Sequence, residues 1–418
     1  MKGGYLDEDM LSTIDLKEYR CQPFVYAFWW YTDIFIYFSH HFITVPTVRW
    51  INEAHDHDVL CLGTFITEFD SGKVFCEQIF SSQENATTLA NVMIDLCEEW
   101  HFDGWLINIE NVVDSSNIPN ILLFLDTLRS GLKSRIGPHS QVIWYDSITF
   151  DGKLAWQNCL NVYNQVFAEK CDGLFTNYTW NRRHLKATEK FVQRKKTTLS
   201  TYDIYFGVDV FGRGAFEGGG FNTYKAVQAA RNHNFSSAIF APGWTSECFK
   251  EISSFDRVFH KLYCCLPVVR PPALFDSEHN NALVNHFKLF REMADVIHPH
   301  RLTKGFACNF TYGLINNREF NPNHREIQPF LLEDDEVRLT ENGIEIGGKK
   351  ESRHVLFLTD IKNVRAFKLT TSNDALTPEV TKEVHNSEPD TFDISEIYVI
   401  KTSDEPALLL DMTFEITG

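Results

Sequence analysis

Short apolar runs alternate with amphipathic stretches between residues 20 and 265. This alternation is typical of an α/β fold with a parallel sheet, and eight such runs predict a (β/α)8 TIM barrel. The predicted strands are Phe24–Phe28, Ile34–Phe38, Leu60–Phe65, Gly104–Ile109, Gln141–Asp146, Gly173–Tyr178, Ile204–Val210 and Ser237–Pro242.

Two connecting helices are clear from their apolar spacing. Leu89 and its apolar neighbours through Trp100 recur at helical intervals, as do the leucines between Ile121 and Leu132. After residue 270 the pattern changes. We expect a barrel over residues 1–270, a helical connection over 271–305 and a smaller accessory β-rich, sandwich-like region over 306–418. Within this last region, residues 316–353 are polar and loop-like.

Composition narrows the classes of partner. Of the 418 residues, 44% are hydrophobic and 14% aromatic, and the net charge is −17. A surface this acidic repels phosphate backbones and disfavours nucleic acid as a partner. The first residues show no apolar signal sequence, and no basic cluster indicates a membrane surface. The sequon at Asn177 falls on a predicted barrel strand. Together these features predict a cytosolic protein without a membrane partner.

The segment from Phe102 to Asn111 is the most informative for chemistry. Side chains alternate along a strand, so Asn108 and Glu110 share one face while Ile107 and Ile109 share the other. The isoleucines suit the interface with the helices. We therefore expect the polar pair to point into the barrel at its C-terminal mouth, where the active sites of this fold lie.

A Glu among apolar strands and aromatics is harder to ionise than one in water, which suits the general acid of a glycosidase. No second carboxylate accompanies Glu110 on its strand, which fits attack by the sugar's own 2-acetamido oxygen with Asn108 orienting that group. The same pair could instead cap a loop or form a buried hydrogen-bonded contact.

Other polar strand ends leave alternatives open. Asp146 and Glu68 could bind sugar hydroxyls or cap loops, and Trp244 could be a sugar platform or a core residue. His40 and His41 are adjacent on a strand and point opposite ways, so they favour polar contacts at the barrel mouth over a metal site. We expect neither a metal ion nor an organic cofactor.

The segment from Asp103 to Glu110 resembles the chitinase-type pattern Asp-Gly-x-Asp-x-Asp-x-Glu, with Asn108 at the last Asp position. This Asn is typical of glycoside hydrolase family 85, the endo-β-N-acetylglucosaminidases. Six further segments resemble the family in its own order, over roughly residues 3 to 265: Gly3–Leu6, Tyr37–His41, Gly63–Glu68, Trp144–Ser147, Asn177–Trp180 and Gly207–Gly214.

The resemblance implies cleavage of the GlcNAc-β1,4-GlcNAc core of N-glycans, on glycopeptides or free oligosaccharides, with retention through an oxazolinium intermediate and with transglycosylation. It implies that Glu110 is general acid and then base, that Asn108 positions the acetamido group, and that Tyr145 donates a hydrogen bond near it, which we expect to require a kink in the strand. The substrate-binding residues implied or considered are His40, Glu68, Asp146, Asn177, Trp180, Asp209, Phe211 and Trp244.

Two rival functions follow from the same residues. A chitinase-like hydrolase would cut polymeric chitin, but chitinases carry Asp where this chain has Asn108. A non-catalytic glycan-binding barrel would typically lack the acid, but Glu110 is present.

Overall fold

The structure is a computed structural model of the whole chain. It describes residues 29–56, 58–194, 196–249, 336–340, 343–384 and 390–416, with shorter pieces at 4–5, 14–15, 26, 285, 288–290, 293, 296–297, 306–308, 314–315 and 319–320. Contacts divide the chain into two compact units. The first comprises residues 1–9, 34–55 and 60–244, and the second comprises residues 10–33, 56–59 and 245–418.

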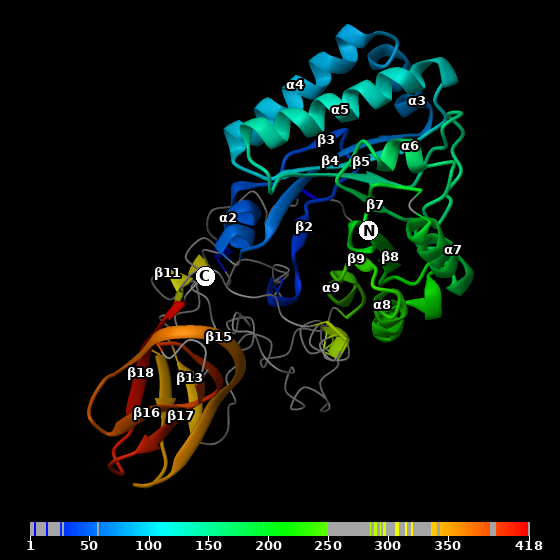
Figure 1. Ribbon diagram of the computed structural model, residues 1–418. Coiled ribbons are helices and arrows are strands. Elements are labelled where there is room, and N and C mark those ends of the chain that lie inside the picture. Colours follow the sequence, from blue (N-terminus) through cyan, green and yellow to red (C-terminus); the bar gives the residue numbers. More distant parts are fainter. Residues whose placement is uncertain are drawn as a thin grey trace. The chain divides into compact units, whose positions relative to one another are not determined.

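The first unit contains a parallel sheet whose strands follow one another in chain order (Figure 1). Its strands are β2 (Ile34–Ile36), β4 (Leu60–Glu68), β5 (Gly104–Glu110), β6 (Gln141–Tyr145), β7 (Gly173–Phe175), β8 (Ile204–Asp209) and β9 (Ser236–Phe240). A short β3 (Ile43–Thr44) adds an antiparallel pairing to β4. The predicted strand at Phe24–Phe28 lies outside the described residues except for Tyr26, and the other seven predictions are confirmed.

The interior of the barrel is one apolar cluster to which all seven parallel strands or the residues just beyond them contribute. Its members are Leu62, Leu106, Ile143, Tyr145 and Phe175, with Ile34, Ile36, Phe38, Tyr178, Tyr205 and Ala238 packed against them. Phe38 follows β2 and Phe240 ends β9, and their rings meet at 5.4 Å. The two edge strands therefore approach each other, as closing a barrel requires.

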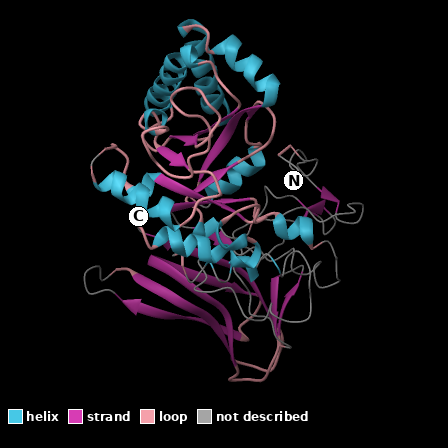
Figure 2. Ribbon diagram, turned by 90° about the vertical axis from the view of Figure 1, so that its right-hand side faces the viewer, coloured by secondary structure: helices cyan, strands magenta, loops and turns pink. Residues whose placement is uncertain are grey.

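Helices cover the outer face of this sheet (Figure 2). They are α2 (Val48–Asp56), α3 (Phe69–Ile79), α4 (Gln83–Trp100), α5 (Ile118–Arg135), α6 (Gln165–Ala168), α7 (Arg182–Gln193) and α8 (Thr223–Arg231). A further helix, α9 (Trp244–Cys248), begins at the last residue of the first unit. The helices predicted from the spacing at 89–100 and 121–132 are confirmed as α4 and α5. On the outward face of β5, the Trp105 indole N–H donates to the Met93 carbonyl of α4 at 3.1 Å.

The second unit carries an antiparallel sheet in the order β13, β14, β18, β15, β17, β16, with β10 paired to β18. These strands are β10 (Phe306–Cys308), β13 (Val337–Thr340), β14 (Gly343–Ile346), β15 (Arg353–Thr371), β16 (Leu376–Val384), β17 (Phe392–Lys401) and β18 (Ala407–Ile416). The long β15 changes partner at Val364, from β17 to β18. A smaller sheet joins β1 (Ile14–Asp15), β11 (Leu314–Ile315) and β12 (Glu319–Phe320).

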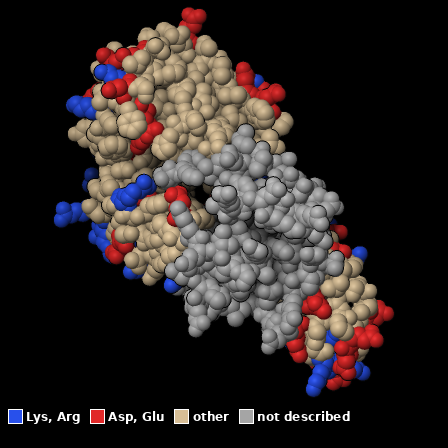
Figure 3. Space-filling view, turned by 180° about the vertical axis from the view of Figure 1, so that it is seen from behind, with Lys and Arg blue, Asp and Glu red and all other residues tan. Residues whose placement is uncertain are grey.

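The accessory β region is thus confirmed, with one correction. Part of the segment predicted to be loop-like, residues 316–353, forms the paired strands β13 and β14. The helical connection predicted for 271–305 lies largely outside the described residues, and the domain boundaries stay predictions. No helix among the described residues is long and apolar enough to cross a bilayer. Figure 3 shows acidic side chains at several places on one face, with basic ones among them.

Candidate active site

Asn108 and Glu110 lie on the interior face of β5. They follow Leu106, a member of the interior cluster, at intervals of two residues, and they pair in register with Ile66 and Glu68 of β4. Asn108 is 4% exposed, whereas Glu110 at the strand end is half-buried. At the C-terminal end of β5 the Asn108 amide therefore lies deeper in the barrel than the Glu110 carboxyl group, and both point inward, as alternation along the strand predicts.

The environment of Glu110 favours its protonated form. Burial raises the pKa of the Glu110 carboxyl group first, and the negative charge of Glu68 raises it further. Hydrogen bonds from the Trp156 and Asn108 side chains, together with the charge of His40, act in the opposite direction. Because the net pKa shift is upward, Glu110 retains its proton at a higher pH than a Glu in water does.

The Asn108 side chain offers an acceptor that the described residues leave unused. Its side chain lowers the pKa of the nearby Glu110 carboxyl group, while its Oδ1 atom is buried and has no hydrogen-bond partner in the part of the chain that the structure describes. Leaving a buried acceptor unpaired costs about 1–3 kcal/mol. The site is thus ready to receive an N–H donor from a bound molecule.

Tyr145 lies on the interior face of β6 with Ile143, without a kink in the strand. The expectation of a kink is wrong, because the large Trp144 side chain points outward and stacks on Phe167 at 4.5 Å. The Tyr145 hydroxyl donates to Asn177 Oδ1 at 3.0 Å. Burial raises the pKa of the Tyr145 hydroxyl well above its ordinary value, so it remains a proton donor at neutral pH.

Asn177 belongs to a polar network at the same end of the barrel. Its Nδ2 atom donates to Asn158 Oδ1 and to Thr179 Oγ1, each at 3.2 Å. The Thr179 amide also donates to Asn158 Oδ1, at 3.0 Å. This network connects Tyr145 to the segments that follow β6 and β7.

His40 and Glu68 form a hydrogen-bonded pair next to Glu110. His40 Nδ1 lies 2.9 Å from Glu68 Oε2, and Glu68 is the register partner of Glu110. His40 is exposed, so this pair lies where the site opens to solvent. Both residues therefore remain available for contacts with a ligand.

Two other candidate carboxylates hold loops. Asp146 is fully buried and accepts from the backbone amides of Gln157 at 3.0 Å and Asn158 at 2.6 Å, and from Asn164 Nδ2 at 2.9 Å. Asp209 is also buried and accepts from the Phe211 amide and from Arg213. For Asp146, these contacts fit the loop-capping alternative better than sugar binding.

The predicted aromatic contacts differ in accessibility. Trp180 is 2% exposed, stacks on Phe216 at 4.9 Å and donates its indole N–H to the Gly207 carbonyl at 2.6 Å. Phe211 and Trp244 are each partly exposed. The Arg213 guanidinium lies over the Phe211 ring at 5.3 Å. Of the three rings, Trp180 is therefore the buried one.

Sequence reasoning missed Trp156 and Asn158. Both lie on the segment between β6 and α6, far along the chain from β5. The Trp156 side chain nevertheless lowers the pKa of Glu110, and Asn158 accepts a hydrogen bond from Asn177. Neither has a local motif that predicts this. The position of both depends on the contacts of this segment with Asp146.

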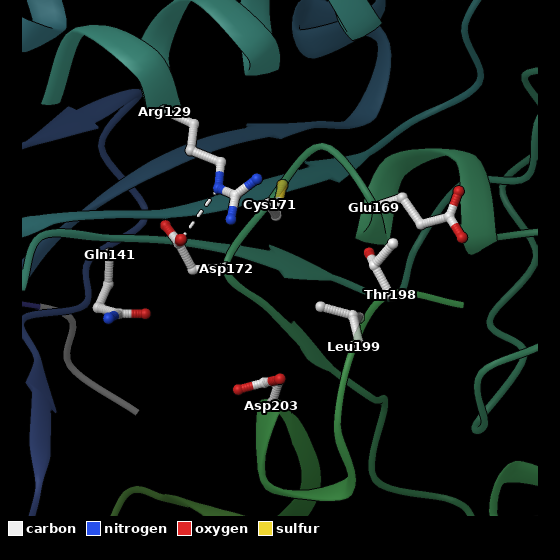
Figure 4. Close-up of a pocket in the computed structure, with 8 residues that line it drawn as sticks. All are labelled: Arg129, Gln141, Glu169, Cys171, Asp172, Thr198, Leu199 and Asp203. Carbon is white, nitrogen blue, oxygen red and sulfur yellow. Dashed lines mark hydrogen bonds and ion pairs between the residues drawn. The ribbon is translucent and has the colours of Figure 1, made fainter. Parts of the chain in front are cut away.

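A separate cavity of about 510 Å³ lies at the opposite ends of the strands (Figure 4). Its lining residues precede or begin β6, β7 and β8, and include Gln141, Asp172 and Asp203. Asp172 pairs with Arg129 at 2.9 Å and accepts from the Val142 amide at 2.9 Å. These contacts join α5 to the start of β6, which is a stabilising role typical of this end of a barrel.

Comparison with solved structures supports the fold. The glycoside hydrolase domain of Endo-D from Streptococcus pneumoniae superposes with a TM-score of 0.61 at 14% identity, over 93% of this chain and 71% of that one. At this identity the likeness concerns the fold alone.

Comparison with known sequences identifies the family of this chain. The chain is 44% identical over 249 residues to cytosolic endo-beta-N-acetylglucosaminidase 1 of Arabidopsis thaliana, 59% of this chain and 35% of that protein. It is 40% identical over 271 residues to the cytosolic endo-beta-N-acetylglucosaminidase of Homo sapiens, 64% of this chain and 35% of that protein. These matches span about a third of the relatives' length. The model of Glycosyl hydrolase family 85 matches residues 6–314. The chain therefore belongs to glycosyl hydrolase family 85.

Proposed function

We propose that this protein is an endo-β-N-acetylglucosaminidase that cleaves the GlcNAc-β1,4-GlcNAc bond in the core of N-glycans. The observation that carries the proposal is the buried Oδ1 atom of Asn108, unpaired among the described residues, beside a Glu110 carboxyl group whose pKa burial raises. A 2-acetamido sugar supplies the missing N–H donor, and its glycosidic oxygen needs the proton. The names of the relatives at 40–44% identity point to the same activity.

In the first step Glu110 donates its proton to the glycosidic oxygen as the bond to the anomeric carbon breaks. The carbonyl oxygen of the 2-acetamido group attacks that carbon and forms an oxazolinium ion. The acetamido N–H becomes more acidic as positive charge develops on it, and Asn108 Oδ1 accepts its hydrogen bond. Hydrogen bonds to developing charge in a water-poor site contribute most when their donors and acceptors are already in place.

In the second step the Glu110 carboxylate takes a proton from the incoming hydroxyl group. Water gives hydrolysis, and a sugar hydroxyl gives transglycosylation. Two displacements at the anomeric carbon give net retention. Tyr145 is a buried phenol with a raised pKa. We assign it as a hydrogen-bond donor to the acetamido group, for which its hydroxyl turns from Asn177 to the bound sugar.

The surrounding residues supply binding. His40, Glu68, Asn177, Phe211 and Trp244 have polar groups or partly exposed rings that suit sugar hydroxyls and ring faces. Trp180, Asp146 and Asp209 are buried, so we assign them to holding the segments that bear these groups. Following the names of its relatives, we place the protein in the cytosol.

Digestion of a defined glycopeptide, followed by mass measurement, tests this function. Cleavage between the two core GlcNAc residues is the expected result, with one GlcNAc left on the peptide. Cleavage of chitin oligomers instead would indicate a chitinase-like enzyme, and binding without turnover would indicate a glycan-binding barrel. Immunofluorescence or fractionation that placed the protein in the secretory lumen would refute the cytosolic assignment.

A further inference from the structure

Exposed apolar side chains are frequent on the two segments that follow β5 and β6. Among the described residues eleven large hydrophobic side chains are exposed, and five of them lie on the segments after β5 and β6. Single exposed apolar residues are common on protein surfaces, but a group beside a site requires an explanation. The five are Val112, Phe150, Trp156, Val162 and Tyr163.

We name four of these exposed residues the aromatic ledge: Val112, on the segment after β5, and Phe150, Val162 and Tyr163, on the segment after β6. They are 51%, 47%, 55% and 50% exposed, respectively. The Phe150 and Tyr163 rings are nearly parallel, with 6° between their planes and 5.9 Å between their centroids. The Phe150 amide also donates to the Tyr163 carbonyl at 2.8 Å, so the pair is held by backbone as well as by ring contact.

The ledge is built on backbone contacts that fix it relative to β5. The Val113 amide donates to the Gly152 carbonyl at 2.9 Å, which ties the segment after β5 to the segment after β6. Gly152 has φ of +80°, and a side chain there would meet the Val113 carbonyl. The two segments therefore approach so closely that only glycine fits between them.

The burial of Asn108, Glu110 and Trp156 increases toward the barrel interior, and this gradient indicates which part of a substrate lies near the aromatic ledge. Asn108 is 4% exposed, Glu110 is half-buried at the strand end, and the exposed Trp156 side chain is near enough to Glu110 to lower the pKa of its carboxyl group. The acetamido sugar must lie against Asn108, and the general acid must face the leaving group. The leaving group therefore lies outward, past Glu110 and toward Trp156, on the segment that also bears Phe150 and Tyr163.

We infer that the aromatic ledge binds the polypeptide next to the glycosylated Asn of a glycoprotein substrate, through its apolar side chains. Beyond the second GlcNAc of an N-glycan the next chemical group is the peptide. Val112 and Val162 offer no hydrogen bond to a sugar hydroxyl, whereas they suit aliphatic and aromatic peptide side chains. This inference rests on the proposed function and specifies its substrate class as glycopeptides rather than free oligosaccharides.

Three substrates with one glycan test the inference. The first is a peptide with Phe and Leu beside the glycosylated Asn, the second a peptide with Gly and Ser there, and the third the free glycan with its intact chitobiose end. We expect kcat/KM to be about tenfold higher for the first than for the other two, the size expected for burying one apolar side chain.

Phe150→Ser and Tyr163→Ser should each remove most of this preference and leave turnover of the free glycan unchanged. Tyr202→Ser is the matched control, because Tyr202 is an exposed aromatic that precedes β8 at the opposite end of the barrel. It should alter none of the three rates. Melting temperatures of all variants show whether the fold is retained.

The outcomes distinguish failure of the proposed function from failure of the peptide-binding inference. No turnover of any substrate by the unmodified protein would refute the proposed function and, with it, the inference. Turnover of all three at equal rates would refute the inference alone. A loss of turnover in Phe150→Ser or Tyr163→Ser that is equal on all three substrates would also overturn it, because the rings would then serve only to hold the segment.

Discussion

Replacing Asn108 with Ala separates the two chemical steps. Asn108 Oδ1 is buried without a partner among the described residues, so in the proposed mechanism it accepts a hydrogen bond only when substrate is bound. A hydrogen bond to a group that gains charge contributes about 1.5–3 kcal/mol, or about 10- to 150-fold in rate. Removing one positioned contact of this kind costs on the order of 10²- to 10³-fold. We therefore expect Asn108→Ala to cleave intact glycopeptides about 100-fold more slowly.

The assay uses one variant with two donors. In the proposed mechanism Asn108 helps to form a bond that a synthetic glycan oxazoline already contains. With Glu110 present as base, Asn108→Ala should transfer this donor to a GlcNAc acceptor at a useful rate, and it should then leave the product uncut. Product mass gives both results.

The fold of this variant should be unaffected. Asn108 Oδ1 is already unpaired in the described part of the structure, so its loss leaves no hydrogen-bond donor among the described residues unsatisfied. Asn108→Asp is the matched variant, because it retains an acceptor oxygen at this position, and it should retain more activity on intact glycans than Asn108→Ala.

Equal losses with both donors would refute acetamido participation and indicate a protein nucleophile. The first carboxylate to examine would then be Glu68, the register partner of Glu110. Asp146 is a weaker candidate, because its carboxylate is buried and already accepts two backbone amides and the Asn164 side chain.

Three further changes have definite expected outcomes. Glu110→Gln should lower kcat for hydrolysis about 10²- to 10⁴-fold at unchanged melting temperature; near-normal turnover would exclude Glu110 as the acid. Glu68→Gln removes a negative charge that raises the pKa of Glu110, so the alkaline limb of the kcat/KM profile should move to lower pH, and an unmoved limb would contradict this coupling. Trp180→Ala should lower the free energy of unfolding in urea by about 3–5 kcal/mol, against under about 1 kcal/mol for the exposed Trp156→Ala; lost activity at full stability would instead place Trp180 in the substrate site.

Regular strands made part of the site predictable. β5 is buried along nearly its whole length, so alternation alone placed Asn108 and Glu110 inside the barrel and the isoleucines outside it. For Tyr145 we expected a kink in the strand, but ordinary alternation with Ile143 already places it inside the barrel. The Trp144 ring instead packs outward on α6, and the strand ends before Asp146.

Features that depend on distant contacts were not predictable from local pattern. The position of Trp156 depends on Asp146, ten residues earlier, accepting the next two backbone amides. The polar segment before β15 lacks long apolar runs, yet β14 pairs with β18, which lies more than 60 residues later in the chain. Such pairings are determined by the partner strand rather than by the segment's own composition.

Asp146 also affects how freely the substrate preference of this enzyme can change. Its buried carboxylate holds the segment after β6 through backbone amides, which every amino acid except proline provides. The path of the segment is therefore nearly independent of the side chains at positions 150, 156 and 163. If the aromatic ledge binds the peptide as proposed, those side chains can be exchanged to favour another peptide while Asn108 and Glu110 on β5 keep their positions.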